Sequence, residues 1–165
     1  YLSAFPEGIA FAVGSEVDVP DFCPDQTIDK VFTIENLTSF YRFKQEHSLV
    51  LYIGGYHNRS RRNLLMHIYQ KLPDAQYYHF GDLDAGGFYI LEHLKRKTGI
   101  PFQMFQMDIE TLKKYEDYAK PLTENDKKRL MQLEKMELPD EERKLITYML
   151  QKGIKLEQEC ISESQ

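Results

Sequence analysis

Short apolar segments alternate with segments of helical periodicity along the first two thirds of this chain. Runs rich in β-branched and aromatic residues predict strands at 30–34, 48–53, 76–80 and 102–105. Between these runs, apolar residues recur every three or four positions, which predicts helices at 37–46, 59–72 and from 85 to about 97. Strict alternation of strand and helix predicts an α/β, Rossmann-like domain whose parallel sheet has about four strands flanked by helices.

The two ends of the chain have a different character. From residue 108 onward the pattern is helical, with a capping-box-like helix start at Thr123 and another helix that begins at Pro139 and stops at Gly153. We expect residues 108–165 to form a helical C-terminal part of the same domain as the core at 31–107. Residues 1–30 are turn-rich and acidic. They are expected to enter the domain from a missing N-terminal region, with a possible short strand at 9–13.

Composition narrows the function classes. The 165 residues suit one domain, and no apolar run approaches the length of a membrane span. The chain start lacks the features of a signal peptide, and two distant cysteines suit a reducing compartment, so a cytoplasmic protein is expected. The net charge is −5, yet residues 31–107 carry a net charge of +3. A basic field around a few clustered acids suits an enzyme that holds a polyanion against metal ions.

Three carboxylates provide the candidate chemistry. Glu35 ends the first predicted strand, and Asp82 and Asp84 follow the third. The carboxyl ends of parallel strands share one edge, which is where open α/β sheets bind ligands. Anions this close repel unless a cation lies between them, and Mg²⁺ or Mn²⁺ prefers such oxygen ligands. The residues therefore predict a site for one or two metal ions of the kind used in phosphoryl transfer. The alternative is a turn whose Asp side chains cap the next helix.

The loop after the second strand opens at the same edge. Its two glycines, Gly54 and Gly55, let backbone approach a phosphate, and the following helix start favours an anion. Three arginines then lie in the first turn of that helix, where positive charge interacts unfavourably with the helix dipole and a nearby anion would be stabilising: Arg59, Arg61 and Arg62. The alternative for them is a solvated basic turn. His57 lies in the loop, within reach of a substrate, whereas His79 lies inside a strand and is expected in the core.

Segments 33–36, 54–61 and 80–87 together resemble the Toprim domain of topoisomerases, primases and some nucleases, in its topoisomerase VI A-subunit branch. With the late segment 156–159, the chain resembles the C-terminal domain of the JetD family over residues 31–160. JetD proteins are nuclease subunits of the Wadjet plasmid-defence systems of bacteria and archaea. The resemblance implies a Toprim fold and a prokaryotic, cytoplasmic, Mg²⁺-dependent DNA endonuclease. It also implies a homodimer that acts on double-stranded DNA with an SMC-type JetABC complex.

The resemblance also assigns roles to residues. Glu35, Asp82 and Asp84 would be the catalytic metal ligands. The loop would face DNA through Gly54, Gly55, His57, Asn58, Arg59, Arg61 and Arg62. The tail would return to the active site, where Glu157 or Glu159 could ligate a second metal; the alternative is an exposed helical end. The chain lacks the winged-helix domain that carries the nucleophilic tyrosine of topoisomerases, so hydrolysis is expected rather than a covalent DNA link.

Two rival functions stay open on the sequence. The domain could serve only for DNA docking or dimerisation, without catalysis. It could also be a phosphatase that uses the first Asp of a D-x-D motif as its nucleophile. In such phosphatases, however, the motif follows the first strand and continues with Thr, whereas here it follows the third predicted strand and continues with Ala85.

Overall fold

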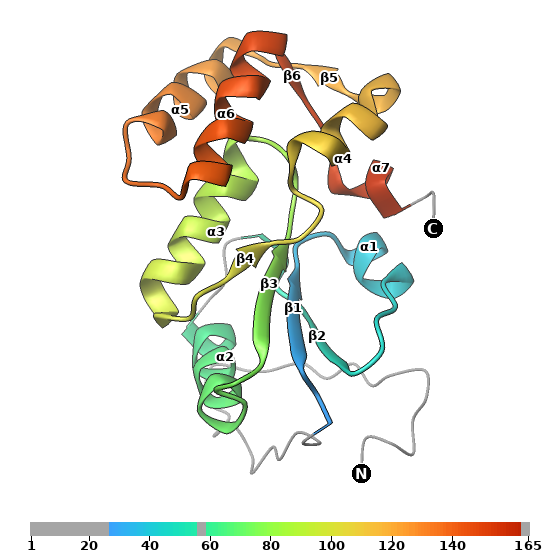
Figure 1. Cartoon of the computed structure of the whole chain (residues 1–165), viewed down its shortest axis with the longest axis vertical. Helices are drawn as coiled ribbons and strands as arrows, with labels where there is room; N and C mark the ends of the chain where they lie inside the picture. Colours follow the sequence, from blue (N-terminus) through green and yellow to red (C-terminus); the bar gives the residue numbers. More distant parts are fainter. Residues whose placement is uncertain (1–26, 56–58, 163–165) are drawn as a thin grey trace.

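A four-stranded parallel sheet forms the centre of the computed structural model, which describes residues 27–55 and 59–162 (Figure 1). Its strands follow the order β2-β1-β3-β4. They are β1 (Lys30–Ile34), β2 (Ser48–Tyr52), β3 (Gln76–Phe80) and β4 (Gln103–Met104). The predicted α/β class and parallel four-stranded sheet are thus confirmed. The possible strand at 9–13 lies outside the described residues.

Helices cover both faces of this sheet, which agrees with the continuous burial of β1 from Val31 to Ile34. On one face, Val31 and Tyr77 share an apolar cluster with α2 (Arg59–Lys71) and α3 (Ala85–Thr98). The other face is covered by α1 (Leu37–Arg42).

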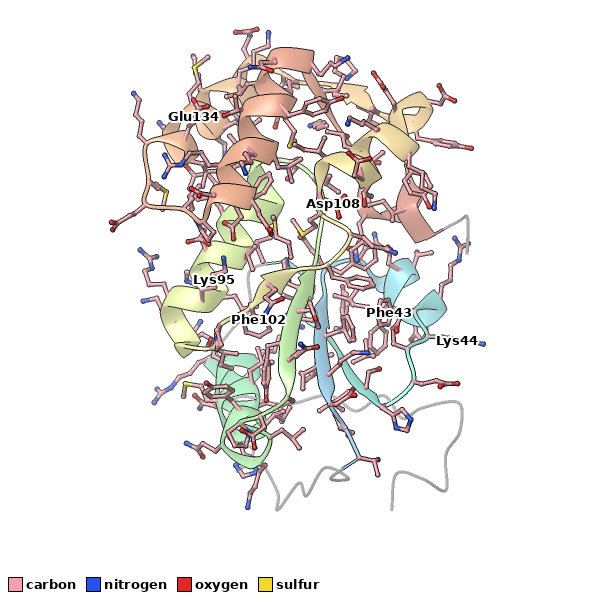
Figure 2. All side chains as sticks on the ribbon, in the orientation of Figure 1. Phe43, Lys44, Lys95, Phe102, Asp108 and Glu134 are labelled. Carbon is pink, nitrogen blue, oxygen red and sulfur yellow. The ribbon has the colours of Figure 1, made fainter. Side chains whose placement is uncertain are left out.

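Helix α1 is shorter than predicted, because the periodicity continues to residue 46 but the helix ends at Arg42. Phe43 adopts an extended backbone. The centroid of its ring lies 4.8 Å from that of Phe32 and 5.6 Å from that of Phe105. Figure 2 shows Phe43 facing the strands while Lys44 extends outward. Aromatic packing against the sheet, a tertiary contact, therefore ends the helix.

The C-terminal third lies over the carboxyl ends of β1 and β3 (Figure 1). It contains α4 (Ile109–Lys114), a 3₁₀ turn (Glu116–Tyr118), α5 (Glu124–Glu134), α6 (Asp140–Lys152) and α7 (Gln158–Ser162). The predicted capping box is present, because the Thr123 and Asp126 side chains each bond the other's backbone amide. Gly153 ends α6 in the left-handed conformation, at φ 69°.

The prediction that this part is helical throughout was wrong at one place. Strands β5 (Lys120–Pro121) and β6 (Ile154–Lys155) pair antiparallel. Directly after β6, Leu156 exchanges two backbone hydrogen bonds with Leu83, at 2.9 and 3.1 Å. A two-residue ladder is too short to create a periodic pattern, and its partner lies far away in sequence. This pairing brings the tail of the chain beside the turn that follows β3.

One apolar cluster joins the sheet to the C-terminal helices. It combines Phe80, Leu83 and Phe88 with Leu145 and Ile146 of α6, all at most 2% exposed. The exit of β3 is therefore fixed by packing from both parts of the chain. Within the described ranges, no helix has the length and apolar character needed to cross a membrane.

Candidate metal centre

The three predicted carboxylates leave the sheet at one edge. β1 and β3 are neighbours, with Ile34 in register with Phe80, so Glu35 and the turn after β3 emerge side by side. The Glu35 amide extends the ladder by donating to the Phe80 carbonyl at 3.1 Å. The charges of Asp82 and Asp84 both act on Glu35. The structure thus brings together residues 47 and 49 positions apart in the sequence, as the parallel sheet predicted.

Glu35 is packed tightly between backbone and a buried histidine. A Cβ atom on Gly81 would lie 2.8 Å from Glu35 Oε2 and 2.8 Å from His79 Nε2, so only glycine leaves room for both side chains. His79 is fully buried, with Nδ1 3.0 Å from Thr33 Oγ1, which confirms the expectation that it belongs to the core.

Glu35 also carries a buried oxygen without a hydrogen-bond partner among the described residues. The Asp82 amide donates to the Glu35 carboxylate, but Oε2 is buried and has no hydrogen-bond partner among the described residues. Burial first, and then the charges of Asp82 and Asp84, raise the pKa of Glu35 to about 7. A proton or a cation at this carboxylate would relieve both the burial cost and the repulsion.

Asp82 and Asp84 are held by different contacts. Asp84 is the N-cap of α3, because its Oδ1 accepts from the Gly87 amide at 2.9 Å, as the capping alternative anticipated. Asp82 Oδ1 accepts from the Gln158 amide at 2.7 Å. Burial raises the pKa of Asp82; this hydrogen bond opposes the rise, and the charges of Asp84, Glu157 and Glu159 add to it. These bonds use only one oxygen of each side chain, so capping does not exclude metal ligation.

The tail contributes a residue that sequence reasoning missed. Gln158 is fully buried, and its Oε1 accepts at 2.9 Å from the backbone amide of Asn36, the residue that follows Glu35. Its own amide holds Asp82, so one residue links the turns that follow β1 and β3. The Asn36 side chain in turn donates to Glu159 at 2.6 Å. These contacts span more than 70 residues of sequence and leave no local signal.

Glu157 and Glu159 of the tail lie beside Asp82 and Asp84. Glu157 precedes α7 and pairs with Lys120 at 2.7 Å, whereas Glu159 lies within α7. Both line one pocket of about 130 Å³ with Asn36, Asp82, Asp84, Lys155 and Leu156. This pocket exceeds by far the roughly 10–15 Å³ that one water molecule needs.

The donor set fits a hard divalent cation, since it offers carboxylate oxygens, an amide and water-accessible space. Glu35 does not line this pocket, but its charge and those of Asp82 and Asp84 repel one another, which favours a cation among them. The ligand geometry is not preformed, because no three His, Cys, Asp or Glu side chains within 27–55 and 59–162 are grouped to hold a metal. Ligation by all three carboxylates therefore requires side-chain rotation.

The loop after β2 begins with two glycines in the left-handed region. Gly54 and Gly55 adopt φ values of 58° and 77°, which favour glycine. The first turn of α2 holds no acidic residue, as the sequence suggested. His57 and Asn58 lie outside the described residues.

The three arginines of α2 have separate surroundings. Arg59 is exposed at the helix start. Arg61 Nη1 donates to the Ile53 carbonyl at 2.5 Å and so ties α2 to the end of β2. Arg62 lies within electrostatic range of His93 on α3. Of these three side chains, Arg59 is the most accessible to an external anion.

Gln158→Leu should destabilise the protein, because the substitution removes the acceptor of the partly buried Asn36 amide. An unsatisfied buried donor costs about 1–3 kcal/mol, which thermal unfolding followed by circular dichroism would detect. Gln151→Leu makes the same chemical change at an exposed position of α6 and should stay within about 0.5 kcal/mol of the parent. Equal melting temperatures for the two variants would show that Gln158 does not hold the site together.

Comparison with known proteins gives two findings. The family described as "Wadjet protein JetD, C-terminal" matches residues 16–165, which include every candidate site residue. The Wadjet protein JetD of Bacillus cereus (strain Q1) is 30% identical over 137 residues, which cover 81% of this chain and 34% of that protein. The chain therefore spans about a third of the length of this relative.

Proposed function

The chain belongs to the JetD family of Wadjet proteins, and from this premise we propose that it is a Mg²⁺-dependent DNA endonuclease domain of the Toprim type. The observation that carries the proposal is the buried Glu35 oxygen without a partner, beside Asp82 and Asp84 at the edge of the sheet. A structural carboxylate would normally be hydrogen-bonded or paired. The Glu35 carboxylate accepts from the Asp82 amide, but its Oε2 has no partner among the described residues, which a ligand position for a metal ion would explain.

In this proposal, Glu35, Asp82 and Asp84 hold Mg²⁺ or Mn²⁺ at the carboxyl edge of β1 and β3. The metal would supply Lewis-acid stabilisation of the phosphate and a more acidic water molecule. Gln158 fixes the backbone beside Glu35 and the orientation of Asp82 through its two hydrogen bonds. Glu157 and Glu159 line the same pocket and are proposed as auxiliary ligands for a second ion.

The proposed substrate is double-stranded DNA, held by the loop after β2. Gly54 and Gly55 permit a close backbone approach, and the exposed Arg59 offers a phosphate contact at the acid-free start of α2. Membership of the JetD family fits the JetABC system, so an SMC-type JetABC complex is the proposed partner. A homodimer of the full-length protein is proposed by the same family resemblance.

Asp82→Asn tests the metal site. Mn²⁺ should raise the melting temperature of the parent protein, because a ligand that binds only the folded state stabilises it by mass action. The substitution removes one anionic ligand and should abolish this rise, together with Mg²⁺-dependent cleavage of plasmid DNA by the full-length protein. Asp117→Asn, at an exposed position of the 3₁₀ turn, is the matched control and should leave both properties unchanged.

The outcomes separate the rival functions. A Mn²⁺ response that survives in the Asp82 variant would refute the proposed ligand set. DNA binding without cleavage by the parent protein, at any Mg²⁺ concentration, would identify a docking or dimerisation module. Hydrolysis of a small phosphomonoester in place of DNA would identify a phosphatase.

A further inference from the structure

The acidic pocket contains one cation with an unusual position. Of the described residues that line it, four are acidic and only Lys155 is basic. Lys155 belongs to β6, the short strand that leads the tail into the site. Its side chain is 21% exposed, so it is neither a freely solvated surface lysine nor a fully buried one.

One firm contact holds the Lys155 ammonium in place. Lys155 Nζ lies 2.9 Å from Asp126 Oδ2. The same oxygen accepts from the Thr123 hydroxyl at 2.7 Å and from the Thr123 amide at 3.0 Å, within the capping box of α5. The anchor of Lys155 is therefore itself fixed by the start of a helix, which orients the ammonium group.

The anchor leaves donor capacity at Lys155. An ammonium group has three N–H donors, and the contact with Asp126 uses one of them. Its cross-strand neighbour Lys120 is committed differently, because Lys120 pairs with Glu157 at 2.7 Å. Like charges opposite each other on a ladder destabilise it. Here each lysine is paired with its own acid, Lys120 with Glu157 and Lys155 with Asp126, which offsets the repulsion. Lys155 is the one of the pair that lines the pocket.

A pocket of carboxylates repels the phosphate that it must accept. A fixed cation inside that pocket offsets this repulsion and offers hydrogen bonds to an anionic oxygen without further reorganisation. We propose that Lys155 contacts a non-bridging phosphate oxygen of the bound DNA strand through the donors not taken by Asp126. This inference rests on the proposed function and names a substrate-contacting residue of the same site.

The test compares three variants of the complete protein. Lys155→Met keeps the length of the side chain and removes its charge. Lys155→Arg keeps the charge. Lys128→Met removes a charge from an exposed position of α5 and serves as the matched control. For each variant we would measure the melting temperature with and without Mn²⁺, plasmid cleavage, and the salt dependence of binding to a short DNA duplex in Ca²⁺.

Lys155→Met should reduce cleavage by about 10²–10³-fold, the loss typical of one removed transition-state donor. The slope of log affinity against log salt should fall by about one, because one phosphate contact is lost. The Mn²⁺-induced rise in melting temperature should persist. Lys155→Arg should regain part of both the cleavage and the salt slope, and Lys128→Met should match the parent.

Two results would overturn the proposal. Cleavage and salt slope in Lys155→Met equal to those of the Lys128 control would leave Lys155 outside the substrate site. Loss of the Mn²⁺ response in Lys155→Met would show that the lysine supports the metal centre rather than the phosphate. A parent protein that neither responds to Mn²⁺ nor cleaves DNA, but still loses salt slope on Lys155→Met, would refute the proposed function and retain the phosphate contact.

Discussion

Glu35→Gln should stabilise the metal-free protein above about pH 7, while abolishing its response to Mn²⁺ and its proposed cleavage of DNA. The pKa of Glu35 is raised from 4.5 to about 7, by burial and then by the charges of Asp82 and Asp84. Above that pH, the folded protein must hold a buried, repelled carboxylate that the unfolded chain exposes to water. Gln has nearly the same shape and removes the charge, at the cost of a metal ligand.

The sign of the pH dependence follows from linkage. Between pH 4.5 and about 7, the folded state keeps the Glu35 proton that the unfolded state has released. The free energy of unfolding therefore falls as pH rises through this window, and levels off above it. The loss from this group is on the order of 3 kcal/mol, or roughly 6–12 °C in melting temperature for a domain of this size.

Thermal unfolding across this pH range, with chelator and with Mn²⁺, would check the prediction. Glu137→Gln, at an exposed position, is the matched control and should follow the parent under every condition. With chelator, the Glu35 variant should melt at a higher temperature than the parent. With Mn²⁺, its melting temperature should rise less than that of the parent. A Glu35 variant with the parent's pH profile would contradict the described burial and repulsion of this carboxylate.

Gly87→Ala should destabilise the fold severely, although Ala normally stabilises a helix by about 1 kcal/mol relative to Gly. A Cβ atom on Gly87 would lie 2.1 Å from the Asp82 carbonyl oxygen, a backbone atom that cannot turn aside. The first turn of α3 thus packs directly on the backbone that presents Asp82. We expect a loss of more than about 4 kcal/mol, or failure to fold.

Gly86→Ala is the matched control, because the nearest atom to its added Cβ is Asp84 Oδ1 at 3.0 Å, on a side chain that can shift at the cost of its N-cap hydrogen bond. This variant should remain within about 1 kcal/mol of the parent. If both variants fold, urea unfolding measures the difference in their free energies of unfolding. If Gly87→Ala does not fold, the soluble yields of the two variants are compared instead. Parent-like stability of Gly87→Ala would mean that α3 does not approach Asp82 as described.

The sequence by itself determined the framework of the site. The strands, their parallel arrangement and the helices between them follow from periodicities of two and 3.6 residues, which are local properties of the chain. Parallel strands share an edge, so the position of Glu35 after β1 and of Asp82 and Asp84 after β3 was enough to predict that they leave the sheet at the same edge. The resemblance to the JetD family, drawn from the same segments, is confirmed by the match over residues 16–165.

Tertiary structure alone decided what surrounds that framework. Gln158 bonds the Asn36 amide 122 residues away, Lys155 reaches Asp126 from another element, and Leu156 pairs with Leu83. Contacts between distant segments leave no periodic signal in the sequence, because packing brings them together only once the core has formed. The same cause ended α1 at Arg42 and gave the arginines of α2 separate surroundings. Local pattern therefore determined which carboxylates share one edge of the sheet, and packing determined which neighbours hold them there.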